Sequence, residues 1–206
     1  MSTINLNKGD KINLYRYCSR DCRILISLEW DIVKRNNTTN NKVKLIKRLI
    51  DKLKFECDAW ILMMKDSVYN SESELVYYNQ KEFYNKKELV VLHHGDKGEN
   101  NAQITLDLSK IPDKYNTIIL GITIYQGKWR RQSFKDIKNI VVSIIDEKSK
   151  YEICKFNQSY ITDSNCEITF IAGKFYKENE EWNFEAIGKG TSARSIGEAI
   201  VSYKHE

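Results

Sequence analysis

Oxygen-bearing side chains gather at three places where apolar runs begin or end. Glu56 and Asp58 open the run FECDAWILMM, and Asn79 follows ELVYY. The third place is the polar segment GDKGENN, residues 95–101, which separates LVVL from ITLDL. Calcium in proteins takes about six to eight oxygens from carboxylates, amides and backbone carbonyls. If the three places are neighbours in the fold, they predict a calcium site with these ligands: Glu56, Asp58, Asn79, Asp96, Glu99 and Asn101.

The same residues also fit ordinary polar turns. Glu56 and Asp58 are two positions apart in a strand-like run, so both carboxylates would point to one face. Like charges repel there unless a cation or basic side chains lie between them. Segment 95–101 is rich in Gly and Asn, which are typical turn residues. On these residues alone, a solvated strand edge and a calcium site both stay open.

Positive charge is concentrated in one segment. The formal net charge is +5, but residues 32–54 hold eight Lys or Arg against one Asp, which leaves −2 for the rest. After the linker-like stretch NNTTNN, the sequence KVKLIKRLIDKLK repeats apolar residues at three- and four-residue spacing. This pattern predicts a basic amphipathic helix at about 42–54, within a basic segment at about 34–54.

Two interpretations of the basic helix stay open. In one, its apolar stripe packs on the protein and its lysines face water. In the other, it docks on an anionic membrane, nucleic acid or an acidic partner. The residues that would then meet the anion are Lys44, Lys47, Arg48 and Lys52.

A second group with anion-binding chemistry lies at KWRR, residues 128–131. Trp129 is flanked by Lys128, Arg130 and Arg131, which could combine ring stacking with phosphate contact. An exposed aromatic residue in a hairpin is the alternative.

The sequence lacks complete motifs of the kinds that are typical of catalytic and zinc sites. The sequence lacks G-x-S-x-G and H-E-x-x-H, and GKGT at 188–191 lacks the upstream glycine of a phosphate loop. His93 and His94 are adjacent in a strand, so one should be packed and the other exposed. Cys18 and Cys22 could join these histidines in a zinc site, but no second half of a zinc motif follows. We expect a non-enzymatic protein with reduced thiols among its five cysteines.

The elements that must position these residues are mostly strands. Short runs rich in Val, Ile, Tyr and Phe alternate with Asn, Asp, Gly and Lys clusters, which predicts an antiparallel two-sheet β-sandwich in a single domain, residues 1–206. Helices are expected at 42–54, 133–139 and 193–203, the last capped by Thr191 or Ser192. No apolar run is long enough for a membrane span, and the polar N-terminus lacks a secretory signal, so we expect a cytoplasmic protein.

The order of these segments resembles the TerD family of tellurium-resistance and stress-response proteins over nearly the whole chain. The matching segments are LNKGDKINL (6–14), LEWD (28–31), FECDA (55–59), VYYNQ (76–80), HGDKGENNAQITLDLSKIP (94–112), IILGITIYQGKWRRQSFKDIKN (118–139) and FIAGKFYKENEEWNFEAIGKG (170–190). The resemblance implies a β-sandwich that binds calcium through acidic loops, and it makes the basic helical segment at about 34–54 an insertion into the family pattern.

Departures from the family pattern imply a weakened calcium site. Gly95, Asp96 and Glu99 match the family loop, but the loop is shorter, and Asn100 and Asn101 stand where the family has aspartates. Because calcium affinity depends on ligand charge and rigidity, one weak site is expected rather than two strong ones. The resemblance implies a calcium-responsive binding or scaffold module of a stress response, with other stress-response proteins as partners. The alternative is a metal-independent basic module for anionic membrane, nucleic acid or a nucleotide.

Overall fold

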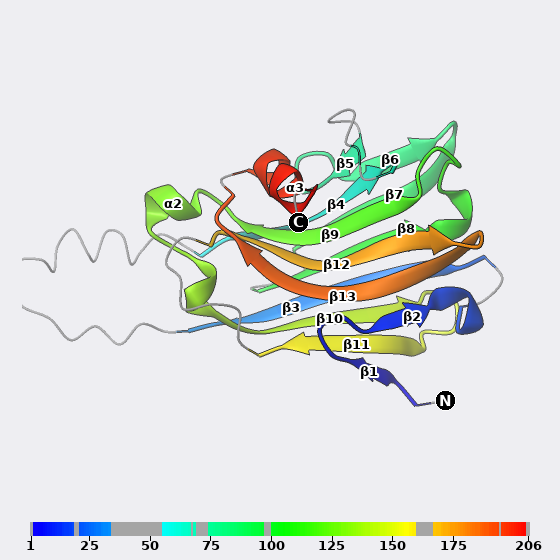
Figure 1. Ribbon diagram of the computed structural model, residues 1–206, viewed down its shortest axis with the longest axis horizontal. Helices are drawn as coiled ribbons and strands as arrows, with labels where there is room; N and C mark the ends of the chain where they lie inside the picture. Colours follow the sequence, from blue (N-terminus) through cyan, green and yellow to red (C-terminus); the bar gives the residue numbers. More distant parts are fainter. Residues whose placement is uncertain are drawn as a thin grey trace, which may run out of the picture.

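The computed structural model describes residues 2–18, 21–33, 55–66, 68, 74–96, 100–159, 167–193 and 195–204. The predicted inserted helix at 42–54, with Lys44, Lys47, Arg48 and Lys52, lies outside the described residues, and so does Glu99. The described chain forms two β-sheets around one large apolar core (Figure 1). The predicted mainly β, two-sheet architecture is therefore confirmed.

One sheet has seven strands. Their order is β1 (Ile4–Leu6), β11 (Glu152–Gln158), β10 (Ile137–Asp146), β3 (Arg23–Ile32), β8 (Asn101–Asp107), β7 (Glu88–Asp96) and β6 (Glu82–Asn85). All neighbouring strands pair antiparallel except β1 and β11, which are parallel. The prediction of a wholly antiparallel sandwich is wrong at this edge, where the N-terminal strand joins a strand distant in sequence.

The other sheet has six strands, and all its pairs are antiparallel. Their order is β2 (Lys11–Asn13), β13 (Glu181–Thr191), β12 (Thr169–Glu178), β9 (Thr117–Ile124), β4 (Cys57–Met64) and β5 (Leu75–Val76). Strand β4 starts directly after Phe55 and Glu56, so Asp58 lies at the beginning of a strand that pairs with β9 on one side and with the edge strand β5 on the other.

Strand β4 is apolar on both faces because each face is covered. Alternate residues, such as Ala59 and Ile61, lie in the core between the sheets. Trp60 and Leu62 point to the other side, where they form a second cluster with Ala199 of α3 (Ile196–Lys204). In Figure 1, α3 lies over this outer face. The near-continuous hydrophobicity of the strand follows from its burial on two sides.

Short helices differ from the sequence expectation in four places. The helix predicted at 133–139 is only a 3-10 turn, η4 (Phe134–Asp136), because β10 begins at Ile137 and pairs with β3. An unpredicted helical turn, α2 (Gly127–Arg130), follows β9. The 3-10 turns η1 (Leu14–Arg16) and η3 (Leu108–Lys110) were not predicted either.

The C-terminal helix is confirmed, but its predicted start and cap are wrong. Thr191 still belongs to β13, opposite Thr169 of β12, so the helix cannot begin there. The Glu198 backbone N–H instead donates to the Ser195 hydroxyl at 3.2 Å. Among the helices in the described part of the chain, none is both long and apolar enough to cross a membrane.

Candidate functional site

Three predicted oxygen-bearing segments converge at one rim of the sandwich. Residues 77–81 lead from β5 in the six-stranded sheet to β6 in the seven-stranded sheet, so the chain crosses from one sheet to the other there. His93 of β7 joins the other two segments to this crossing. Its Nε2 lies 3.1 Å from the Ala59 carbonyl oxygen in β4, and its backbone N–H donates to the Lys81 carbonyl at 2.8 Å. The start of β4, the crossing and the end of β7 are therefore neighbours, which we call the rim.

Asp58 faces outward at the rim. Its neighbours Cys57 and Ala59 are buried in the core between the sheets, so strand alternation directs the half-buried Asp58 to the opposite face. Burial raises the pKa of the Tyr78 hydroxyl, and the negative charge of Asp58 raises it further. Tyr78 precedes Asn79 in the crossing segment, so the structure brings Asp58 and the turn that carries Asn79 together.

Glu56 is held by a basic side chain. Its Oε2 lies 3.2 Å from Nη1 of Arg130, and its backbone carbonyl accepts a hydrogen bond from the Tyr125 N–H at 2.9 Å. The Arg130 guanidinium also lies over the Tyr125 ring, 4.9 Å from its centroid. Only 11% of the Arg130 side chain is exposed. Arg130, which we predicted to bind an anion at the KWRR segment, thus relieves the repulsion expected between Glu56 and Asp58.

The β7–β8 connection is anchored by its backbone. Gly95 has a left-handed φ of +76°, which glycine adopts without strain, and its N–H donates to His93 Nδ1 at 2.9 Å. Asp96 pairs with Ala102 across a register shift, and Asn101 lies opposite Glu29 of β3. Nothing is described of the Asp96 side chain or of Glu99. The backbone thus places two predicted ligands, Asp96 and Asn101, at the β7 and β8 ends of the rim.

The described side chains do not by themselves complete a metal site. Within the described ranges, no three His, Cys, Asp or Glu side chains are grouped so as to hold a metal ion. A calcium shell at the rim would therefore combine Asp58 with amide and backbone oxygens of the described segments. These donor atoms are the hard oxygens that calcium prefers, but the described residues supply only part of the number that a calcium shell needs.

The zinc site that the sequence offered, with Cys18, Cys22, His93 and His94 as ligands, likewise has no cluster of ligands among the described residues. His93 bonds to Ala59 and Gly95, and His94 Nε2 lies 2.8 Å from the Thr105 hydroxyl. His93 is buried and His94 is exposed, which confirms that adjacent strand residues point to opposite faces.

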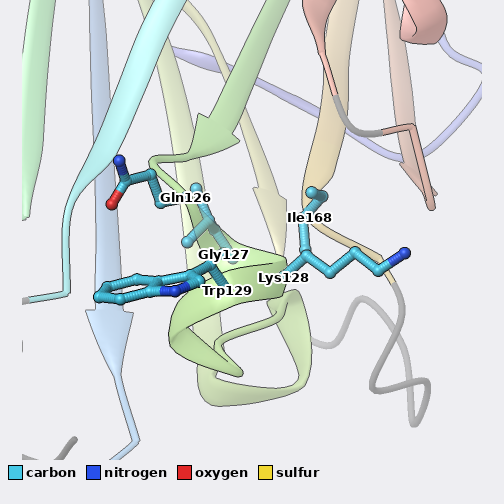
Figure 2. Close-up of a pocket in the computed structure, with 6 residues that line it drawn as sticks. Gln126, Gly127, Lys128, Trp129 and Ile168 are labelled. Carbon is cyan, nitrogen blue, oxygen red and sulfur yellow. The ribbon is translucent and has the colours of Figure 1, made fainter.

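A groove of about 420 Å³ adjoins the rim at α2. It is lined by Ile124, Gln126, Gly127, Lys128, Trp129 and Ile168. In Figure 2, Trp129 and Lys128 extend to opposite sides of the α2 turn, with Ile168 on the Lys128 side. Trp129 is 73% exposed, and Arg131 is exposed as well. Of the predicted KWRR residues, Lys128, Trp129 and Arg131 are exposed, whereas Arg130 is mostly buried against Glu56.

Sequence reasoning missed the apolar wall of this groove. Ile124 ends β9 and Ile168 precedes β12, and the Ile124 N–H donates to the Ile168 carbonyl at 2.8 Å. Only strand order brings these two residues together. Tyr78 and Tyr125, which flank the acids, were missed for the same reason, although Tyr78 directly precedes the predicted ligand Asn79 in the sequence.

Comparison with known proteins gives matches over most of the chain. The sequence profile of the TerD domain matches residues 1–203. A stress response protein, SCP2, of Bacillus subtilis is 25% identical over 97% of this chain and 98% of its own. The tellurium resistance protein TerD of Serratia marcescens is 24% identical over 91% of both chains.

Solved structures agree on the fold. A crystal structure of a homologue of the telluride resistance protein from Streptomyces coelicolor aligns with a TM-score of 0.51 at 13% identity, covering 83% of this chain and 90% of that one. A protein of unknown function aligns with a TM-score of 0.56, also at 13% identity, covering 85% of this chain and 92% of that one.

Proposed function

The chain belongs to the TerD family, and from this premise we propose that it is a stress-response protein that acts by binding rather than by catalysis. The match covers 98% of a relative named for stress response and 91% of one named for tellurium resistance, which supports a related role. We propose a cytoplasmic location and other stress-response proteins as partners. A binding role also agrees with the engagement of His93 and His94 in hydrogen bonds within the fold.

We propose that the ligand at the rim is a single, weakly bound calcium ion. The supporting observation is the convergence of the β4 start, the crossing at 77–81 and the β7 end, held by the hydrogen bonds of His93 to Ala59 and Lys81. The proposed ligands are those of the sequence prediction, namely Glu56, Asp58, Asn79, Asp96, Glu99 and Asn101. A bound calcium would supply positive charge that links segments from both sheets.

Two features of the chain would make this binding weak. Asn100 and Asn101 offer amides rather than carboxylates, so the segment contributes less negative charge. Glu56 already pairs with Arg130 at 3.2 Å, so it would have to leave this partner to reach a cation. Asp58 is half-buried on the outward face of β4, beside the turn that carries Asn79, so it is the carboxylate on which the proposed site depends most.

Calorimetric titration of the full chain with calcium tests the proposal. We expect binding in the millimolar range, lost in Asp58→Asn and retained in Asp113→Asn. Asp113 is the matched control because it is fully exposed and lies after η3, away from the rim. If the unaltered protein gives no calcium-dependent heat, or if both variants behave alike, the rim does not bind calcium.

A second candidate function is supported by the α2 groove. The exposed indole of Trp129, with Lys128 and Arg131 on the same short turn, has the chemistry for stacking on a base and contacting phosphate. This would be a metal-independent activity, to which the basic segment at 34–54 could add charge.

Fluorescence anisotropy with a labelled single-stranded oligonucleotide, measured with a calcium chelator present, tests this alternative. Trp129→Ala and Lys128→Gln should each weaken binding, and raising the salt concentration should weaken it further. Equal affinity for the unaltered protein and Trp129→Ala would rule out the groove, and binding only to anionic vesicles would assign the basic surface to a membrane instead.

A further inference from the structure

Two cysteine sulfurs lie almost within bonding distance of each other. Cys18 follows η1, and Cys22 directly precedes β3. Their Sγ atoms are 2.6 Å apart. A disulfide bond is about 2.05 Å long, so the two atoms would have to move together by roughly half an ångström. Both cysteines are free thiols in this structure.

The surrounding backbone holds the pair in this position. The Cys18 N–H donates to the Leu14 carbonyl at 2.9 Å, which fixes it to η1. The Cys22 carbonyl accepts a hydrogen bond from the Leu108 N–H at 3.1 Å, which fixes it to η3. Cys22 also has a φ of +35°, a left-handed conformation that non-glycine residues seldom adopt. The approach of the sulfurs is therefore imposed by neighbouring elements.

The two thiols differ in their access to solvent. Cys18 is half-buried, whereas Cys22 is completely buried. The direct contact with the Cys18 side chain raises the pKa of the Cys22 thiol, and burial and the charges near it raise it further. Cys22 is thus kept as a neutral thiol that points at the more accessible sulfur. This asymmetry assigns different parts to the two residues, with Cys18 meeting an oxidant and Cys22 completing the reaction.

We propose that Cys18 and Cys22 form an oxidation site that hydrogen peroxide converts into an intramolecular disulfide. In the first step the Cys18 thiolate attacks one peroxide oxygen, the O–O bond breaks, and the departing hydroxide takes a proton to become water. The product is a Cys18 sulfenic acid. In the second step the Cys22 sulfur attacks the Cys18 sulfur, the S–S bond forms, and hydroxide leaves with the Cys22 proton as a second water.

The balance is two thiols and one peroxide giving one disulfide and two waters. Peroxide is reduced by two electrons, and a small dithiol such as dithiothreitol reverses the change by exchange. Disulfides in a reducing compartment are typically transient and redox-sensing, which is the use that a half-exposed pair would serve. The inference rests on the cysteine geometry and does not depend on calcium or on the α2 groove.

Peptide mapping of the unaltered full chain tests the proposal without any variant. After peroxide treatment, the protein is alkylated with N-ethylmaleimide under denaturing conditions and cleaved with trypsin. Because Arg20 separates the two cysteines, the disulfide would join two tryptic peptides, residues 17–20 and 21–23. We expect this linked pair, lighter by two hydrogens than the sum of its parts, and its disappearance after dithiothreitol.

Variants then separate the two roles. Cys22→Ser should stop at the sulfenic acid, which dimedone traps on residue 18. Cys18→Ser should leave Cys22 alkylated as in the untreated protein. Cys57→Ser is the matched control, because Cys57 is buried and distant in sequence, and it should form the linked peptides normally.

Three results would overturn the proposal. In the first, both cysteines of the unaltered protein are fully alkylated after a peroxide exposure that oxidises Cys18 in Cys22→Ser. In the second, the disulfide maps to another pair of cysteines. In the third, the linked peptides form as readily after the chain is unfolded in denaturant. The last result would show that closeness in sequence, rather than the fold, brings the two sulfurs together.

Discussion

Replacing Arg130 with Met should make the protein bind calcium more tightly while making the calcium-free protein less stable. Arg130 and Glu56 form an ion pair with an N–O distance of 3.2 Å, and Glu56 belongs to the proposed calcium ligands. A calcium ion must therefore compete with the guanidinium for the same carboxylate. Met keeps much of the apolar length that packs beside Tyr125 but removes the competitor.

The magnitude follows from the exposure of the pair. The Arg130 side chain is 11% exposed, but that of Glu56 is 43% exposed, so water screens the interaction. Such a pair contributes about 0.5–1 kcal/mol. Returning this free energy to the calcium complex lowers Kd by a factor of about two to five. At saturating calcium, the calcium-induced rise in Tm should increase by about 1–4 °C for a chain of this size.

The assay compares calcium titrations and thermal unfolding of Arg130→Met, Arg131→Met and the unaltered protein. Arg131→Met is the matched control, because it removes the same charge from the neighbouring, exposed position. We expect the gain in affinity in Arg130→Met and little change in Arg131→Met. The reasoning is refuted if the two variants gain equally, since the effect is then one of net charge, or if Arg130→Met binds calcium as the unaltered protein does.

Three further predictions concern stability, pH and the α2 turn. A Cβ at Gly121 would overlap the Trp60 indole, so Gly121→Ala should lower the free energy of unfolding in urea by about 1–3 kcal/mol, whereas Gly197→Ala, at an exposed position of α3, should not lower it. Burial raises the pKa of the Cys154 thiol from 9.0 to about 12, so the unfolded chain loses this proton first as the pH rises. The free energy of unfolding should then fall between pH 9.0 and about 12, by up to about 1.4 kcal/mol per pH unit. In urea titrations over this pH window, Cys154→Ala should show a shallower fall, and an equal fall in both proteins would show that Cys154 is not the group responsible. Trp129 is 73% exposed while Trp30, Trp60 and Trp182 are buried, so Trp129→Phe should remove most of the iodide-quenchable fluorescence, and unchanged quenching would show that another indole is accessible.

Local sequence patterns determined the class of fold and the family. Alternation of apolar and polar residues, broken by Gly, Asn and Asp, predicted the strands because a strand exposes alternate residues to two environments. The same alternation placed His93 inside and His94 outside. The collinear segments identified the TerD family, which the domain profile confirms.

Element ends were less predictable than the elements. Residues 133–139 were predicted to form a helix, and Thr191 or Ser192 to cap the last one, yet β10 starts at Ile137 and β13 extends to Thr191. In both cases pairing with a neighbouring strand prevailed over a local helical preference. The close Cys18 and Cys22 pair was visible in the sequence and was weighed as half of a zinc site. Its actual geometry depends on the left-handed φ of Cys22 and on anchors from η1 and η3.

Only the tertiary structure decided which side chains meet. Glu56 and Arg130 are far apart in the chain and were assigned to two separate functions, but the β4–β9 pairing makes them partners. Ile124 and Ile168 form a groove wall because β9 and β12 are adjacent, and the rim exists because residues 77–81 pass from one sheet to the other. A local pattern reports whether a face is buried, and it carries no information about what lies against that face. Strand order supplies that information, and strand order is fixed by the packing of the whole chain.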